Sequence, residues 1–122
     1  MKVLIVDDDD SVLDTLKIFF ETLSEGYVVT TAETAKDGLR KFDEGFDLVL
    51  LDIHLPDGDG VQVLDQMQMK DKKVPVVLVT AYKDATKVIE AFRKGAYDCL
   101  LKPFNFEYLR DSILKKISRR MI

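Results

Sequence analysis

The sequence predicts an α/β fold in which a parallel sheet is covered by helices on both of its faces. Strand-like segments and amphipathic helix-like segments alternate five times along the chain. The strand-like segments are short runs of branched aliphatic residues, which are typical of strands buried on both faces. Two of them, Val3–Val6 and Leu48–Leu51, run directly into aspartates. Strict alternation with one helix per crossover favours a doubly wound sheet, so these acids are expected at its carboxyl edge.

Five strands are predicted at Val3–Val6, Tyr27–Ala32, Leu48–Leu51, Val76–Thr80 and Tyr97–Leu101. Five strand–helix units, (βα)5, fit the flavodoxin-like strand order 2-1-3-4-5. In that order the first and third strands are neighbours, and the topological switch point of the sheet lies between them. We therefore expect Asp7, Asp8 and Asp52, which follow these two strands, to converge at one rim.

The intervening segments have apolar residues at helical spacing and recognisable ends. In the first helix, Asp10 is the expected N-cap and Gly26 the expected stop. The second helix begins at about Thr34, a candidate cap, and runs to Gly45. The other three are predicted from Val61, Leu64 and Met67; from Val88, Ala91 and Phe92, with a stop at Gly95; and from Leu109, Ile113, Leu114, Ile117 and Met121.

The length and composition are typical of one globular domain. At 122 residues, with 33% charged and 47% hydrophobic residues, residues 1–122 are expected to form a single domain. The net charge of −4 argues against direct nucleic-acid binding. The one cysteine, Cys99, cannot form an internal disulfide, and no stretch approaches the roughly 20 apolar residues of a membrane span. We therefore expect a cytoplasmic location and no membrane contact.

Polar side chains stand at the ends of four of the predicted strands: Asp7 and Asp8, then Asp52, then Thr80, then Lys102. Clustered carboxylates raise one another's pKa values unless positive charge lies among them. Mg²⁺ is the usual hard cation for one or two carboxylates together with a phosphate. The pattern therefore predicts metal-assisted phosphoryl chemistry.

Four pieces of sequence carry these side chains in a specific order. They are VLIVDDD (Val3–Asp9), DLVLLDIHLPDGDG (Asp47–Gly60), VVLVTA (Val76–Ala81) and GAYDCLLKPF (Gly95–Phe104). Together they resemble the receiver domain of two-component response regulators over essentially the whole chain. The last two pieces look most like receivers attached to AAA+ sigma-54 activators. The resemblance implies a phosphorylatable signalling switch, a phosphoprotein of a phosphorelay that regulates transcription, and not a multiple-turnover enzyme.

The resemblance also implies a role for each residue of the metal site. Asp52 would be the nucleophile that accepts a phosphoryl group from a phosphohistidine on a sensor histidine kinase. Asp8 would bind Mg²⁺ directly and Asp7 would hold it through water. Asp52 and the backbone carbonyl of His54 would complete the protein ligands.

Other residues would contact the phosphoryl group. Lys102 would pair with one phosphoryl oxygen, and Thr80 would donate a hydrogen bond to another. The backbone N–H groups of Ile53 and Ala81 could donate hydrogen bonds to the remaining phosphoryl oxygens. In this family a cis peptide bond is expected before Pro103.

Three positions bear on the lifetime of the phosphoryl group and on the switch. His54 and Tyr82 occupy the rate-tuning positions of the family, and both are bulky, so slow self-dephosphorylation is expected. Cys99 stands where receivers usually carry an aromatic ring that rotates on activation. It is expected to be a small packed residue. Tyr97, two positions earlier, is expected on the same strand face, where it could replace that ring.

The resemblance names partners without identifying them. A sensor histidine kinase is implied, and the face made by the fourth helix, fifth strand and fifth helix could form a homodimer or dock a target. The chain ends inside its last helix, so a C-terminal output domain is expected to be absent from it. Asp57-Gly58-Asp59-Gly60 is predicted as a turn into the third helix, because it lacks the spacing of a calcium loop.

Three other functions stay open on the residues alone. A phosphatase of the haloacid dehalogenase type also uses an aspartyl phosphate, but it has a second acid where this chain has His54. Flavin binding on the same fold would need Ser, Thr and Gly after the first strand, where four aspartates stand instead. A receiver-like module that is never phosphorylated would not need the full set of polar residues.

Overall fold

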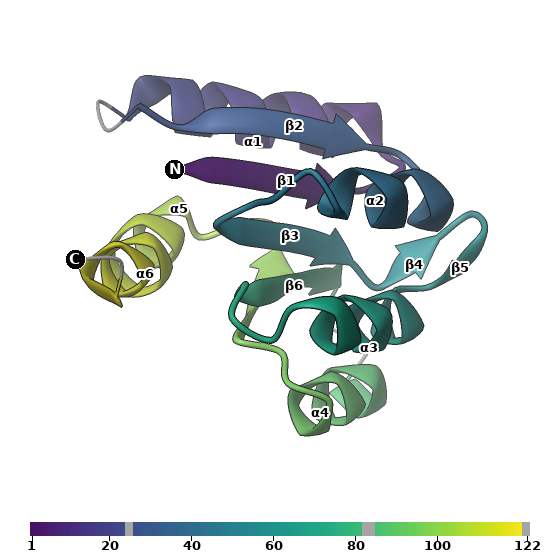
Figure 1. The fold of residues 1–122 in the computed structure, drawn as a ribbon. Coiled ribbons are helices and arrows are strands. Elements are labelled where there is room, and N and C mark those ends of the chain that lie inside the picture. The colour runs from purple at the N-terminus through teal and green to yellow at the C-terminus, as the bar shows by residue number, and fades with distance from the viewer. Residues whose placement is uncertain (24–25, 82–84, 121–122) are drawn as a thin grey trace.

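The computed structural model describes residues 1–23, 26–81 and 85–120. Within them, the main sheet contains β1 (Lys2–Val6), β2 (Val28–Ala32), β3 (Leu48–Asp52), β6 (Val76–Ala81) and β7 (Asp98–Lys102). All neighbouring strands are parallel, and their order is β2-β1-β3-β6-β7 (Figure 1). The predicted order 2-1-3-4-5 is therefore confirmed. The register places Val6 beside Leu51, so β1 and β3 end together.

Helices cover both faces of this sheet. They are α1 (Asp10–Thr22), α2 (Ala35–Phe42), α3 (Gly60–Lys70), α4 (Ala85–Arg93), α5 (Phe106–Tyr108) and α6 (Lys115–Arg120). Residues of α2, α3 and α4 belong to one hydrophobic cluster, and residues of α1 and α6 belong to the other. Figure 1 shows α2 and α3 in front of the sheet and α1 behind it. None of the helices among the described residues is long and apolar enough to cross a membrane.

The central strands are continuous aliphatic runs because both of their faces are covered. In β1, Leu4 and Val6 enter the cluster on the α2 and α3 side, while Val3 and Ile5 enter the cluster on the α1 side. All five residues of β3 are buried. Each fully buried aliphatic side chain contributes about 1.5–3 kcal/mol. The two clusters therefore hold the strands that carry the acidic residues at their ends.

Two predicted helix caps had different outcomes. Thr34 caps α2 as expected, because its side-chain oxygen accepts a hydrogen bond from the Asp37 N–H at 3.0 Å. The cap of α1 is Asp9 and not Asp10. Asp9 has an extended backbone, and its carboxylate accepts from the Ser11 N–H at 2.9 Å, whereas Asp10 is already helical. The prediction of Asp10 was wrong by one residue, since four consecutive aspartates offer no sequence signal that separates them.

Two local features were not predicted. The loop after β3 forms a short antiparallel hairpin of β4 (His54–Leu55) and β5 (Gly58–Asp59) before α3 begins. The last helix is interrupted by a π-helical stretch over Leu109–Leu114, between α5 and α6. The predicted apolar position Met121 lies outside the described residues.

Gly60, the first residue of α3, packs directly against the backbone of the β3 end. A Cβ atom on Gly60 would lie 2.3 Å from the Asp52 carbonyl oxygen and 2.6 Å from the Ile53 Cα. Its N–H also donates to the Ile53 carbonyl at 2.7 Å. The beginning of α3 and the end of β3 therefore share a contact with no room for a side chain.

Substitution of Gly60 by alanine should consequently destabilise the protein. The expected loss in free energy of unfolding is about 1–3 kcal/mol, because backbone atoms must move to admit the methyl group. Urea unfolding would measure it. Gly58→Ala is the matched control, since its Cβ would meet Ala35 Cβ at an ordinary 3.5 Å. Equal stability of both variants would contradict this account of Gly60.

Candidate functional site

Three carboxylates meet at the carboxyl ends of β1 and β3. Asp7 and Asp8 follow β1, and Asp52 is the last residue of β3. One carboxylate oxygen from each lies within 4.8 Å of the others. Asp7 is 1% exposed and Asp52 is 7% exposed, whereas Asp8 is open to solvent. The convergence expected from the strand order is therefore present, and two of its three acids are buried.

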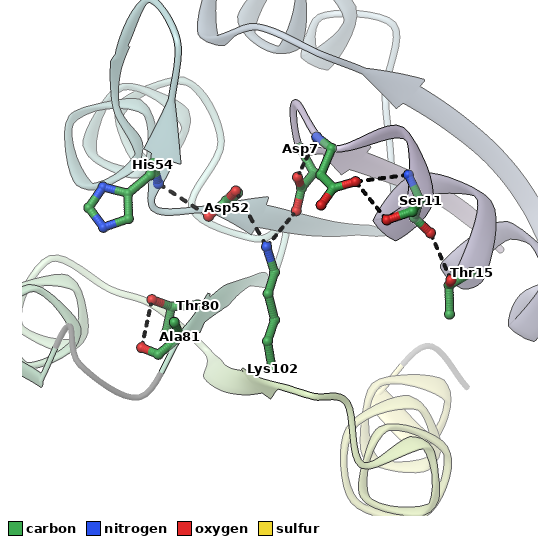
Figure 2. A network of polar contacts seen from close by, with 9 residues as sticks. Asp7, Ser11, Thr15, Asp52, His54, Thr80, Ala81 and Lys102 are labelled. Atoms are coloured by element: carbon green, nitrogen blue, oxygen red, sulfur yellow. Dashed lines mark hydrogen bonds and ion pairs between the residues drawn. The ribbon is translucent and has the colours of Figure 1, made fainter.

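Lys102, at the end of β7, brings positive charge to this cluster. Its Nζ lies 3.2 Å from Asp7 Oδ2 and 3.6 Å from Asp52 Oδ2 (Figure 2). Burial of the ammonium opposes its charge, but the Asp52 and Asp7 carboxylates outweigh burial and raise the pKa of Lys102. The side chain thus stays a cation between two buried acids. The peptide bond between Lys102 and Pro103 is cis, as expected.

Burial and neighbouring charges change the protonation of Asp52. Burial, followed by repulsion from Asp7, raises the pKa of Asp52 from 3.8 to about 6. The His54 N–H and the Lys102 ammonium oppose this shift without cancelling it. The site therefore holds more negative charge than one lysine compensates, and a further cation would favour the ionised Asp52.

The backbone of His54 contributes to the site in a way that the sequence interpretation missed. Its N–H donates to Asp52 Oδ1 at 3.2 Å, while its imidazole points away from Asp52 (Figure 2). An aspartate that accepts from the N–H two residues later is a common local motif, so the sequence held a signal for this bond. The predicted use of the carbonyl of His54 as a metal ligand stays a prediction.

The Thr80 hydroxyl and the Ile53 amide, both expected to contact the phosphoryl group, have other hydrogen-bond partners in this structure. The buried Thr80 hydroxyl donates to the Ala81 carbonyl at 3.2 Å (Figure 2). The Ile53 N–H, just after the end of β3, donates to the Val79 carbonyl of β6 at 3.4 Å. A phosphoryl group would therefore need the Thr80 hydroxyl to turn from the Ala81 carbonyl.

The donor set fits a hard divalent cation. The ligand atoms available from Asp7, Asp8 and Asp52 are carboxylate oxygens, which Mg²⁺ prefers over nitrogen or sulfur. Their surplus of negative charge supplies the electrostatic driving force. The site has few protein oxygens, which suits Mg²⁺ because this ion keeps several water ligands.

The residues expected to take part in switching lie apart from one another. Cys99 is half-buried and packs against the cluster on the α3 and α4 side, and burial raises the pKa of its thiol to about 11. Tyr97 packs against the opposite cluster, on the α1 side. The expectation that Tyr97 shares a face with Cys99 was wrong, because β7 begins only at Asp98 and strand alternation does not reach Tyr97. Tyr82 lies outside the described residues.

Comparison with known proteins identifies the class to which this fold and site belong. The family model described as the response regulator receiver domain matches residues 3–114. The chain therefore belongs to the receiver domains of two-component response regulators, which are signal-transduction domains.

Individual relatives agree with this family. The chain is 37% identical over 109 residues to the regulatory protein AtoC of Escherichia coli (strain K12), covering 88% of this chain and 23% of AtoC. It is 34% identical over 115 residues to the probable C4-dicarboxylate response regulator DctR of Bacillus subtilis (strain 168), covering 93% of this chain and 51% of DctR. A solved receiver domain protein (CheY-like) of Methanospirillum hungatei JF-1 superposes with a TM-score of 0.89 at 34% identity, covering 98% and 95% of the two chains. The chain thus spans about a quarter to a half of these two curated relatives.

Replacing Asp52 by asparagine should stabilise the metal-free protein at neutral pH. The pKa of Asp52 in the folded state, about 6, lies above its ordinary 3.8. Between these two pH values the folded protein therefore keeps a proton on Asp52 that the unfolded chain has lost. The contribution of Asp52 to stability therefore falls as pH rises from about 4 to about 6 in the wild type. In EDTA at pH 7, Asp52→Asn should be more stable by roughly 1–3 kcal/mol.

Urea unfolding of both proteins at several pH values would measure this difference. It should shrink toward pH 4, at which wild-type Asp52 is already protonated in the folded state. A variant that is less stable than the wild type at pH 7 would show that the Asp52 charge is compensated without a metal.

Proposed function

We propose that this receiver domain is a switch that accepts a phosphoryl group on Asp52 from a sensor histidine kinase, with Mg²⁺ bound beside it. The observation that carries this proposal is the position of Asp52, buried among acids with the Lys102 ammonium 3.6 Å from its carboxylate. Membership of the receiver family supports the same conclusion. On this view residues 1–122 form one receiver domain.

The transfer is a displacement at phosphorus. A carboxylate oxygen of Asp52 forms a bond to the phosphorus of a phosphohistidine, and the phosphorus–nitrogen bond breaks. The imidazole leaves with the electron pair of that bond and takes up a proton. The product is an acyl phosphate on Asp52, which water later hydrolyses, so one chain carries one phosphoryl group at a time.

The side chains around Asp52 have distinct tasks. The Lys102 ammonium would exchange its ion pairs with Asp7 and Asp52 for one with a phosphoryl oxygen. The Thr80 hydroxyl turns from the Ala81 carbonyl to a second phosphoryl oxygen. This turn is the first structural change of the switch. The His54 ring points away from Asp52, so it would have to turn toward the acyl phosphate to shield it from water (Figure 2).

Mg²⁺ would be held by Asp7, Asp8, Asp52 and the backbone carbonyl of His54. When bound, it supplies charge neutralisation between the carboxylates and the incoming phosphoryl group. Asp8 is the exposed member and would bind it directly, while the buried Asp7 would act through water. Asp7 also accepts the Asp9 N–H at 2.9 Å, which holds its carboxylate in place.

The face formed by α4, β7 and α5 would be the surface that binds a second copy or a target after phosphorylation. Each of these elements exposes apolar side chains, which are Ile89 (55% exposed), Phe92 (46%), Leu101 (42%) and Tyr108 (39%). Exposed apolar side chains of this kind are suited to a homodimer or a target surface. Because the curated relatives are longer than this chain, an output domain that controls transcription is the partner proposed for it.

The first experiment is the intact mass after incubation with Mg²⁺ and acetyl phosphate. One phosphoryl group per chain is expected on the wild type, and none on Asp52→Asn or in the presence of EDTA. Continuous release of phosphate from monoester substrates would instead indicate an enzyme of the haloacid dehalogenase type. A folded wild-type protein with no adduct from either acetyl phosphate or a phosphorylated kinase would contradict the proposal.

Loss of the Lys102 charge should slow phosphorylation without weakening metal binding. For Lys102→Met, the rate with acetyl phosphate should fall about 100-fold, as when one donor to a developing anion is removed. Mg²⁺ affinity should hold or rise, because Lys102 competes with the metal for Asp7 and Asp52. Lys94→Met, which removes an ion pair with Asp65 on α3, is the matched control and should leave the rate unchanged. Equal rates for wild type and Lys102→Met would refute this role.

A further inference from the structure

The loop that leaves β3 after Asp52 carries two backbone groups of the proposed site. The His54 N–H donates to Asp52 at 3.2 Å, and the His54 carbonyl is the proposed metal ligand. The loop continues through β4 and β5 and enters α3, where the Gly60 N–H donates to the Ile53 carbonyl at 2.7 Å. Whatever holds the outer end of this hairpin therefore helps to position His54.

Asp57, at the tip of the hairpin, is bound to the N-terminus of α2. Its two carboxylate oxygens accept hydrogen bonds from the Ala35 N–H at 2.7 Å and the Lys36 N–H at 3.0 Å. These amides belong to the first turn of α2, where no partner within the helix is available. A carboxylate is favoured there by charge and by the helix dipole. The next residue, Gly58, also lies close to α2, since a Cβ on it would be 3.5 Å from Ala35 Cβ.

The helix that Asp57 binds is itself fixed to the strand carrying the other acids. Gly38 of α2 packs so closely on β1 that a Cβ there would lie 3.0 Å from Val6, the residue before Asp7. Ala35 and Phe42 are buried in the same cluster as Val6. Asp57 thus connects the loop of Asp52 and His54 to the element packed on β1.

From this geometry we propose that Asp57 is a positioning residue, which sets the distance between the Asp52 and His54 groups and the Asp7 and Asp8 carboxylates for Mg²⁺. This inference rests on the proposed function. Asp57 does not touch the metal site itself, so it acts through the hairpin. Asp59 anchors the other side of the hairpin by capping α3 and pairing with Lys87 of α4 at 2.6 Å, which leaves Asp57 as the anchor toward β1.

Three variants separate positioning from charge and from helix stability. Asp57→Ala removes both hydrogen bonds to α2. Asp57→Asn removes the negative charge and keeps one oxygen, which can accept from one of the two N–H groups, whereas its side-chain NH2 cannot accept from the other. Thr34→Ala is the matched control, because it removes the other side-chain cap of α2 and leaves the hairpin bonds in place. For each protein, Mg²⁺ affinity would be measured by following amide NMR shifts during titration with MgCl₂, and stability by urea unfolding.

Positioning predicts a specific order of Mg²⁺ affinities. Asp57→Ala should bind about tenfold more weakly than wild type, as when a residue supporting a metal ligand is lost. Asp57→Asn should stay within about threefold of wild type, since it keeps a neutral, weaker hydrogen bond. Thr34→Ala should lose stability and retain wild-type affinity.

Other results would overturn the inference. If Asp57→Asn were as weak as Asp57→Ala, the hydrogen bond that asparagine keeps would not support the metal site, and the positioning role would be refuted. If Thr34→Ala weakened Mg²⁺ binding equally, Asp57 would act only through the stability of α2. Both results leave the proposed function intact if the wild type binds Mg²⁺ and is phosphorylated. A wild type that binds no Mg²⁺ would overturn the inference together with the proposed function.

Discussion

Burial of like charge at the end of two neighbouring strands is the constraint on which the rest of this structure depends. Asp7 and Asp52 are almost completely buried, and a buried carboxylate is costly unless it is paired and hydrogen-bonded. The fold meets this demand with contacts that come from distant parts of the chain. Lys102 reaches both acids from β7, and the amides of Asp9 and His54 donate to them locally. These contacts do not fully compensate the negative charge, since the pKa of Asp52 stays raised, and the remaining charge would favour a cation at the site.

Much of the fold and the location of the site could be predicted from the sequence. The aliphatic runs of β1 and β3 have both faces buried, so they carry a strong signal that needs no knowledge of the partner strands. Once a parallel sheet with one helix per crossover is assumed, the strand order brings Asp7, Asp8 and Asp52 together by topology. The Thr34 cap followed from residue type. These inferences succeeded because each depends on a local pattern or on a rule of connectivity.

The features that were missed depend on contacts between residues far apart in the chain. Asp57 looks like a turn residue in its own segment, and nothing nearby shows that it binds amides 21 and 22 residues earlier. Tyr97 was placed on the face of Cys99 by counting in twos, but the strand begins one residue later and the ring packs on the other side. The prediction of the α1 cap failed for a different reason. Asp9 and Asp10 belong to a run of four aspartates, and only the backbone conformation distinguishes the one that caps the helix.

The position of Asp52 would make the proposed metal and protons compete for the same oxygen atoms. With its pKa near 6, a fraction of metal-free chains carries a proton on Asp52 in mildly acidic solution. A cation that needs the ionised carboxylate must displace this proton, so its apparent affinity declines as the solution becomes more acidic. In the proposed phosphoryl transfer, the same protonated carboxyl would be a poor nucleophile. On the proposed function, burial of this acid would therefore couple phosphorylation of the domain to the acidity of the solution.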